Sequence, residues 1–197
     1  MRYLQTFFQW IKPILSATII VGLLLVTGLF DDVSYVAQSA IMKTGVLNAS
    51  TTTEDAPEDF DYGFGLQDLD GNKIEASELK GKVIFLNLWA TWCGPCRVEM
   101  PSIQQLYETT SSNENIVFII LSIDSSEDKE KVRNYIRKKG FTFPVYMPRG
   151  YLTQQLTVPS IPTTFIVSKE GKVVRKEVGT TNFGKPRFAE FLQKLTQ

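Results

Sequence analysis

The stretch Trp89-Ala90-Thr91-Trp92-Cys93-Gly94-Pro95-Cys96 holds the only two cysteines of the chain, in the spacing C-x-x-C. It follows the apolar run Val83-Ile84-Phe85-Leu86-Asn87-Leu88, which predicts a buried strand. Pro95 then stands where the first turn of a helix accepts proline, and apolar residues continue at helical spacing. A strand that leads directly into a helix places Cys93 at the helix N-terminus, where the helix dipole makes a thiol ionise more easily. The stretch therefore predicts a redox nucleophile.

The composition argues against two classes of function. The chain has 197 residues with 21 acidic and 21 basic side chains, so its zero net charge gives no electrostatic reason to expect nucleic acid as a partner. It contains no histidine, and two cysteines alone cannot complete a four-ligand zinc site. We therefore expect neither a metal site at C-x-x-C nor a nucleic-acid partner.

Residues 13–30 form an uncharged, apolar run that is long enough to cross a bilayer as a helix. Arg2 and Lys12 precede the run, whereas two aspartates follow it. Because basic residues stay on the cytoplasmic side, we predict a transmembrane anchor at 13–30 that leaves residues 1–12 as a cytoplasmic tip.

A cleaved signal peptide is the competing interpretation, with Ala37-Gln38-Ser39 as a small-x-small cleavage site. That site lies well past the apolar run, and the run is long for a signal sequence, which favours an uncleaved anchor. In both cases the chain after residue 31 is exported to an oxidising compartment, where disulfide chemistry operates.

Residues 31–59 divide into two parts. Apolar residues recur at helical spacing from Val33 to Ile41, which fits either a short amphipathic helix on the outer membrane surface or a partly ordered stalk. Asn48–Asp59 is polar, lacks periodicity and contains Pro57, so it predicts a flexible linker that gives the next domain reach from the membrane.

Residues 60–197 have the length of one domain and alternate strands with helices. A continuous apolar run at 116–123 is typical of a central strand buried on both faces. The crossover units demand parallel neighbouring strands and the closing hairpin adds antiparallel ones, so the expected fold is α/β, with a mixed sheet flanked by helices. The expected elements are a hairpin (64–69 with 73–75), strands at 83–88, 116–123, 143–147, 161–167 and 172–178, and helices that start at Cys93, end at Gly140 and span 186–195.

Local signals give finer expectations at the ends of these elements. Ser77 is expected to cap a short turn, and Asp124-Ser125-Ser126 to cap the helix that Gly140 ends. Pro101 is expected to kink the helix that follows Cys96.

The domain resembles thioredoxin-fold proteins, and in particular the membrane-anchored TlpA/ResA-like thiol–disulfide oxidoreductases of bacteria. The resemblance implies a thioredoxin-like fold with an N-terminal β-hairpin extension, behind the transmembrane helix. It covers residues 60–197 and rests on several motifs rather than on C-x-x-C alone: Gly81-Lys82-Val83, Asn87-Leu88-Trp89-Ala90-Thr91-Trp92-Cys93-Gly94-Pro95-Cys96-Arg97, Glu99-Met100-Pro101, and Ile161-Pro162-Thr163-Thr164-Phe165 before a Lys-Glu-Gly turn.

Cys93 resembles the attacking thiol of this family, and Cys96 the buried resolving thiol. Cys93 would attack a substrate disulfide to give a mixed disulfide, and Cys96 would then attack Cys93 and release the reduced substrate. An inert structural disulfide is disfavoured, because a bridge that encloses two residues barely restricts the unfolded chain. The resemblance thus implies a redox-active Cys93–Cys96 disulfide and no other cofactor.

Pro162 resembles the cis-proline that faces C-x-x-C in this fold; the alternative is an ordinary trans proline at the start of a strand. A cis bond exposes the backbone of Ile161, which is then expected to pair with an extended substrate strand. Trp92, Gly94 and Pro95 complete the expected substrate-binding surface.

Two positions, Asn87 and Glu99, define the subfamily. Thioredoxins of the cytoplasmic type carry a buried aspartate, the proton acceptor of the resolving cysteine, where this chain has the neutral amide Asn87. Glu99 matches the glutamate of ResA-like proteins and lies three residues after Cys96, so it is the candidate proton acceptor, with a pKa raised by burial. A solvated helix-surface glutamate is the alternative. Trp89 is expected in the core.

The Gly94-Pro95 dipeptide is that of reducing thioredoxins and lacks the glutamate of the ResA pattern. We therefore expect a tethered reductase of exported protein disulfides, for example those of apocytochromes c, with an integral-membrane electron donor. The alternatives are a thiol oxidase or isomerase, and a non-catalytic binding module for a membrane partner; a peroxidase is disfavoured because Cys93 has a vicinal resolving thiol. The expected location is the bacterial cytoplasmic membrane, with one span and the catalytic domain facing the periplasm or the cell exterior.

Overall fold

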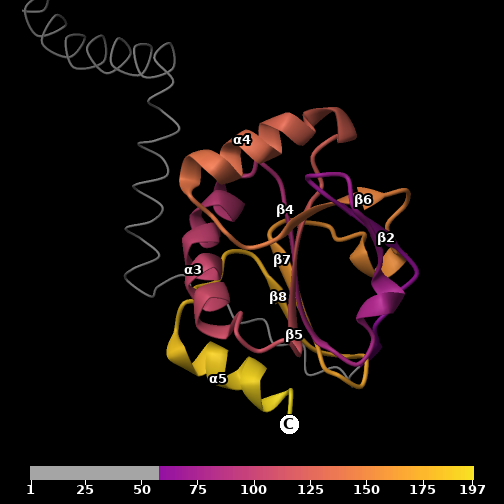
Figure 1. Cartoon of the computed structure of the whole chain (residues 1–197), viewed down its shortest axis with the longest axis vertical. Coiled ribbons are helices and arrows are strands. Elements are labelled where there is room, and N and C mark those ends of the chain that lie inside the picture. The colour runs from indigo at the N-terminus through magenta and orange to yellow at the C-terminus, as the bar shows by residue number, and fades with distance from the viewer. Residues whose placement is uncertain (1–57) are drawn as a thin grey trace, which may run out of the picture. The chain divides into compact units, whose positions relative to one another are not determined.

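One eight-stranded sheet organises residues 58–197, the part of the chain that the computed structural model describes (Figure 1). Its strands lie in the order β1-β8-β7-β4-β5-β6-β2-β3. β4 pairs in parallel with β5, and β5 with β6, while the other pairs are antiparallel, so the predicted mixed sheet is confirmed.

The elements follow the predicted order of hairpin, strand, helix, strand, helix, three strands and helix, with one short strand before them. The strands are β1 (Glu58–Asp59), β2 (Gly65–Asp68), β3 (Lys73–Glu75), β4 (Val83–Trp89), β5 (Ile116–Ser122), β6 (Val145–Arg149), β7 (Thr163–Val167) and β8 (Lys172–Val178). The helices are α3 (Gly94–Thr110), α4 (Lys129–Lys139) and α5 (Pro186–Lys194), with short 3-10 turns η1 (Ala76–Leu79), η2 (Ser126–Asp128) and η3 (Gln154–Leu156).

Side chains of β4 alternate between two core layers, because successive strand residues point to opposite faces. Phe85 and Trp89 belong to the layer that α3, α4 and α5 cover, and Figure 1 shows α3 and α5 along one side of the strands. Leu86 and Leu88 belong to the other layer, which residues before and within the β2–β3 hairpin cover. By the same alternation, Asn87 faces α3, which brings a polar side chain under the helix that carries both cysteines.

Three strand boundaries differ from the sequence prediction. β1 pairs Glu58 and Asp59 with β8, so the sheet begins two residues before the expected boundary at residue 60. β6 begins at Val145 and runs to Arg149, instead of spanning 143–147, because its later residues pair with β2. β7 starts at Thr163, after Pro162, whose nitrogen has no hydrogen to donate to a ladder.

One capping prediction is wrong, and the other holds for Ser125 alone. Glu75, rather than Ser77, caps η1, through a capping box with Glu78. Ser125 caps η2, whereas Asp124 turns away from the helix and binds the end of β4.

Two other local signals lie in the helices. Gly140 ends α4 in a left-handed conformation with φ of 71°, as predicted. α3 continues through Pro101 as far as Thr110, and the kink expected at this proline stays a prediction.

The predictions for the N-terminal region lie outside the described residues: the tip at 1–12, the anchor at 13–30, the amphipathic segment and the linker up to residue 57. In the part that the structure covers, no helix combines the length and apolar character that a bilayer span requires.

Candidate active site

Cys93 occupies the N-cap position of α3. The chain leaves β4 at Trp89 and enters the helix at Gly94, and the Cys93 Sγ accepts a hydrogen bond from the Cys96 backbone N–H at 3.2 Å. Pro95 lies in the first turn, where the helix needs no N–H donor. Because N–H groups at a helix N-terminus stabilise an anion, this position favours a thiolate on Cys93 in the reduced protein. The predicted placement of Cys93 is confirmed.

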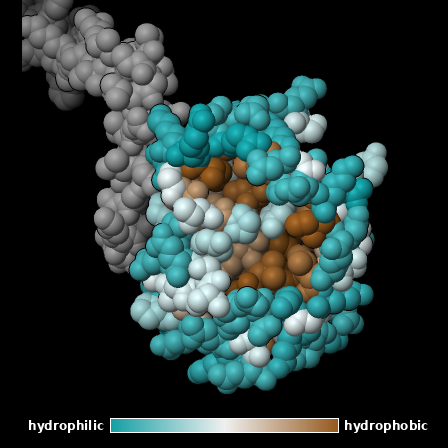
Figure 2. All heavy atoms as spheres, in the orientation of Figure 1, coloured by the Kyte–Doolittle hydropathy of each residue, from teal (hydrophilic) through white to brown (hydrophobic). Residues whose placement is uncertain are grey.

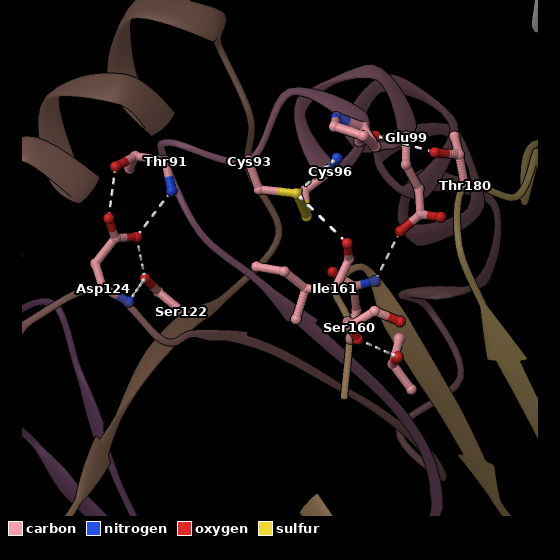
Figure 3. Close-up of a disulfide and its surroundings, with 12 residues drawn as sticks. Thr91, Cys93, Cys96, Glu99, Ser122, Asp124, Ser160, Ile161 and Thr180 are labelled. Carbon is pink, nitrogen blue, oxygen red and sulfur yellow. Dashed lines mark hydrogen bonds between the residues drawn. A yellow bond between two sulfur atoms is a disulfide. The ribbon is translucent and has the colours of Figure 1, made fainter. Parts of the chain in front are cut away.

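Cys93 and Cys96 form a disulfide (Figure 3). Cys93 is the outer partner, with 6% of its surface exposed, against 1% for Cys96. The Cys93 Sγ lies 3.8 Å from the carbonyl oxygen of Ile161, on the loop before β7. A reagent that reaches this disulfide therefore meets Cys93 first.

The loop before β7 faces the disulfide, as predicted. The Ile161–Pro162 peptide bond is cis. The Thr163 hydroxyl donates to the Ser160 carbonyl at 2.8 Å, and the Gly179 N–H donates to the Pro162 carbonyl at 2.8 Å, so both flanks of the loop are held. Pairing of the Ile161 backbone with a substrate strand stays a prediction.

The remaining predicted surface residues surround the disulfide at the start of α3. Trp92 is 63% exposed, Pro95 is exposed and Gly94 is half-buried, so all three are accessible to a partner. Trp89 is fully buried, as expected, and its ring centroid lies 5.6 Å from that of Tyr135. A role for these residues in substrate binding stays a prediction.

Glu99 is a buried residue of the active-site helix α3 and lies on the face of that helix that packs on the sheet. It follows Cys96 by three residues on α3, and residues at this spacing share one face of a helix. Its Oε1 accepts a hydrogen bond from the Asn87 Nδ2 at 2.8 Å, and its Oε2 accepts one from the Thr181 N–H at 2.8 Å. The alternative of a solvated surface glutamate is therefore wrong.

Burial is the largest cause of the raised pKa of Glu99, which is about 8. The hydrogen bonds from Thr181 and Asn87 oppose this rise, and the charge of Glu177 adds to it. The pKa of a free thiol is roughly 8.5. A proton can therefore pass between a thiol and this carboxyl group with little difference in free energy.

Asn87 holds the Glu99 carboxyl group without titrating. Its Nδ2 donates to Glu99 and also to the Thr164 hydroxyl oxygen at 2.8 Å, whereas its buried Oδ1 has no hydrogen-bond partner among the described residues. Thr164 belongs to β7, directly opposite Asn87 in the sheet. The amide therefore links the active-site helix to two central strands.

Sequence reasoning missed the role of Asp124, which lies on the other side of the disulfide in Figure 3. One carboxylate oxygen accepts from the Thr91 N–H at 2.8 Å and from the Ser122 hydroxyl at 2.6 Å, and the other accepts from the Thr91 hydroxyl at 2.6 Å. A signal was available, because parallel β4 and β5 end side by side and the residues after them become neighbours. Asp124 thus fixes the segment that leads to Cys93.

A separate hollow opens between α4 and the β2–β3 turn. Its lining includes the side chains of Ile136, Phe141 and Phe143, and none of the predicted site residues. Figure 2 shows hydrophobic atoms gathered in a hollow below α4, inside a hydrophilic rim.

Within residues 58–197, no group of three or more potential metal-ligating side chains occurs.

The fold and this site define a thioredoxin-like thiol–disulfide oxidoreductase: a C-x-x-C disulfide at the junction of a central strand and a helix, a facing cis-proline and a buried carboxyl group. The family model described as "AhpC/TSA family" matches residues 54–176, and the chain belongs to this family.

Curated relatives and solved structures agree with this assignment. The thiol-disulfide oxidoreductase ResA of Bacillus cereus is 40% identical over 134 residues, which are 68% of this chain and 75% of that protein. ResA of Bacillus subtilis (strain 168) is 38% identical over 118 residues, 59% of this chain and 64% of that protein. A thioredoxin-family thiol:disulfide interchange protein from Chlorobium tepidum TLS superposes with a TM-score of 0.58 at 25% identity, over 74% of this chain and all of that one. StoA from Bacillus subtilis shares the fold, with a TM-score of 0.53 at 24% identity over 68% of this chain and 96% of that one.

Proposed function

We propose that this oxidoreductase works as a reductase of disulfides in exported proteins, tethered to the membrane by residues 13–30. The observation that carries the reducing direction is the environment of Cys93. The Cys93 Sγ accepts a hydrogen bond from one backbone N–H, that of Cys96, and the chain has no histidine that could add a positive charge beside the thiolate. Because a strongly oxidising pair owes its potential to a stabilised reduced form, weak stabilisation of the thiolate favours electron donation.

In the reducing direction, the Cys93 thiolate attacks one sulfur of the substrate disulfide. The substrate S–S bond breaks, its second sulfur leaves as a thiolate, and a mixed disulfide remains on Cys93. Cys96 then attacks the Cys93 Sγ, which releases the first substrate sulfur and forms the Cys93–Cys96 disulfide. Two electrons pass to the substrate in total. Glu99 takes the proton that Cys96 loses before its attack, and an external dithiol, for which we propose an integral-membrane donor, reduces the pair again.

The direction of electron flow has a direct test. We expect a reduction potential below about −200 mV and catalysis of insulin reduction by dithiothreitol. A potential near about −120 mV would assign the protein to the oxidases instead. Insulin turnover no faster than dithiothreitol alone would support the non-catalytic binding module.

The location and the substrate class need tests in cells. A reporter fused after Asp59 is expected to be active only on the exported side of the membrane, and recovery of a soluble mature protein that starts near residue 40 would exclude the anchor. Cys96→Ala is expected to trap substrates as mixed disulfides on Cys93, because the resolving thiol is missing. We propose apocytochromes c as one substrate class, and their absence among the trapped partners would remove it.

A further inference from the structure

Three polar side chains lie in one row across the sheet beneath α3. Asn87 of β4 is paired with Thr164 of β7, which is paired with Glu177 of β8. Residues directly opposite one another in antiparallel strands project to the same face of the sheet. Glu177 therefore lies on the face that α3 covers, where Glu99 is hydrogen-bonded to Asn87.

Glu177 is buried in a way that a strand-surface glutamate is not. Only 1% of it is exposed, and its Oε1 accepts hydrogen bonds from the guanidinium of Arg175 on the same strand. Arg175 is itself fixed, since its guanidinium carbon lies 5.2 Å from the ring centroid of Phe188 and 5.9 Å from that of Phe191, both on α5. Arg175 therefore holds the buried Glu177 side chain in an ion pair of fixed position.

We propose that Glu177 is a positioning residue that makes the Glu99 carboxylate a base strong enough to take the proton that Cys96 loses. Two carboxyl groups in a poorly solvated layer resist carrying negative charge together, and the guanidinium of Arg175 assigns that charge to Glu177. The groups that face Glu99 fit this division of roles: β4 supplies the neutral Asn87, and α3 supplies Cys96, which does not titrate while it is disulfide-bonded. The inference rests on the proton-transfer role proposed for Glu99.

Glu177 acts through Glu99 and not on the disulfide itself. In each catalytic cycle Glu99 must accept the proton of Cys96 and lose it again. A fixed negative charge nearby makes the Glu99 carboxylate a stronger base, so it takes the proton more readily from a buried thiol. Without that charge, Glu99 would ionise at lower pH and would hold the Cys96 proton less firmly.

The test is an infrared titration of the full chain in detergent, in the disulfide form, from about pH 5 to about pH 10. The band of the protonated Glu99 carboxyl group is assigned by its loss in Glu99→Gln. Glu177→Gln keeps the shape of the side chain and an acceptor for Arg175. In this variant the midpoint of the band is expected to fall by about 1 pH unit. The matched control Glu190→Gln removes an exposed carboxylate from α5 and is expected to leave the midpoint unchanged, because solvent screens that charge.

A second variant protects the test against misfolding of the first. R175M/E177M replaces the ion pair by apolar side chains, a change that buried pairs often tolerate, and the midpoint is expected to fall in the same direction. A wild-type midpoint in the folded Glu177 variants would overturn the inference. The pH profile of mixed-disulfide resolution is measured in parallel and is expected to shift with the band. A midpoint that falls without a shift in the profile would uphold the coupling and refute the proton-transfer role of Glu99.

Discussion

Two buried carboxyl groups flank the Cys93–Cys96 disulfide, and the domain holds them in different ways (Figure 3). Asp124 accepts three hydrogen bonds from Thr91 and Ser122, and these join the ends of two parallel strands. Glu99 accepts two hydrogen bonds, and the charge of a third carboxyl group, that of Glu177, raises its pKa. The contrast shows that burial alone does not give a carboxyl group its role. Donors make Asp124 a clamp, whereas burial and a like charge raise the pKa of Glu99, which suits this group to the proton transfer proposed for it.

The largest effect that would test this comparison is the pH dependence of stability. The pKa of Glu99 is about 8 in the folded protein, above its value of 4.5 without burial. The folded state thus holds a proton that the unfolded chain releases, so this contribution to stability is complete below about pH 4.5 and is lost as the pH rises through about 8. Over this window we expect the free energy of unfolding to fall by a few kcal/mol more for the wild type than for Glu99→Gln. Urea unfolding of the two oxidised proteins at several pH values measures the difference, and parallel curves would refute the buried titration.

The second effect is kinetic and separates the two carboxyl groups directly. Glu99→Gln keeps the shape of the side chain and removes the proton acceptor, so resolution of mixed disulfides by Cys96 should slow by roughly 10² near neutral pH, about 2.7 kcal/mol. Attack by Cys93 should change little, and its thiol titration should lose a coupled step. Stopped-flow measurement of product release gives both rates. Resolution at the parental rate with an unchanged titration would remove Glu99 from the mechanism.

The smallest of the three effects concerns the clamp. Asp124→Ala removes three acceptor contacts and leaves the Thr91 and Ser122 donors to find water, so we expect a loss of stability of about 1–3 kcal/mol. The pH profile of mixed-disulfide resolution should keep its wild-type midpoint, because the proton path does not include Asp124. Chemical unfolding and the pH–rate profile measure the two quantities. A displaced midpoint with intact stability would assign Asp124 to the proton path instead of to the clamp.

Local patterns predicted the elements and the dithiol well. The apolar run before the cysteines, the C-x-x-C spacing and the proline that follows are consecutive in the chain, so they specify a strand, a helix N-terminus and a cysteine at their junction. β1 was not predicted and the bounds of β6 were misplaced, for one physical reason. Each is fixed by its pairing with a strand distant in sequence, and a local pattern contains no information about that partner.

The buried polar groups show the same limit. Sequence spacing brought Glu99 to the side of Cys96, but the donors that hold it come from Asn87 and from Thr181, which is 82 residues away. Glu177 was not predicted, because a bulge between Ile166 and Val167 shifts the register of β7 and β8. The bulge changes which residues of β8 face the helices, so a strict alternation cannot place Arg175 and Glu177.

The sequence by itself determined where the two thiols lie and that Cys93 stands at the helix N-terminus, because those properties follow from spacing along one strand and one helix. The tertiary structure decided which carboxyl group clamps the site and how far burial raises the pKa of Glu99. That choice depends on how many donors and charges surround each group in three dimensions. Those neighbours reach Glu99 from β4, β8 and the segment before α5, and Asp124 from the end of β4. A pKa is set by such neighbours and by burial, and neither exists until the sheet has formed.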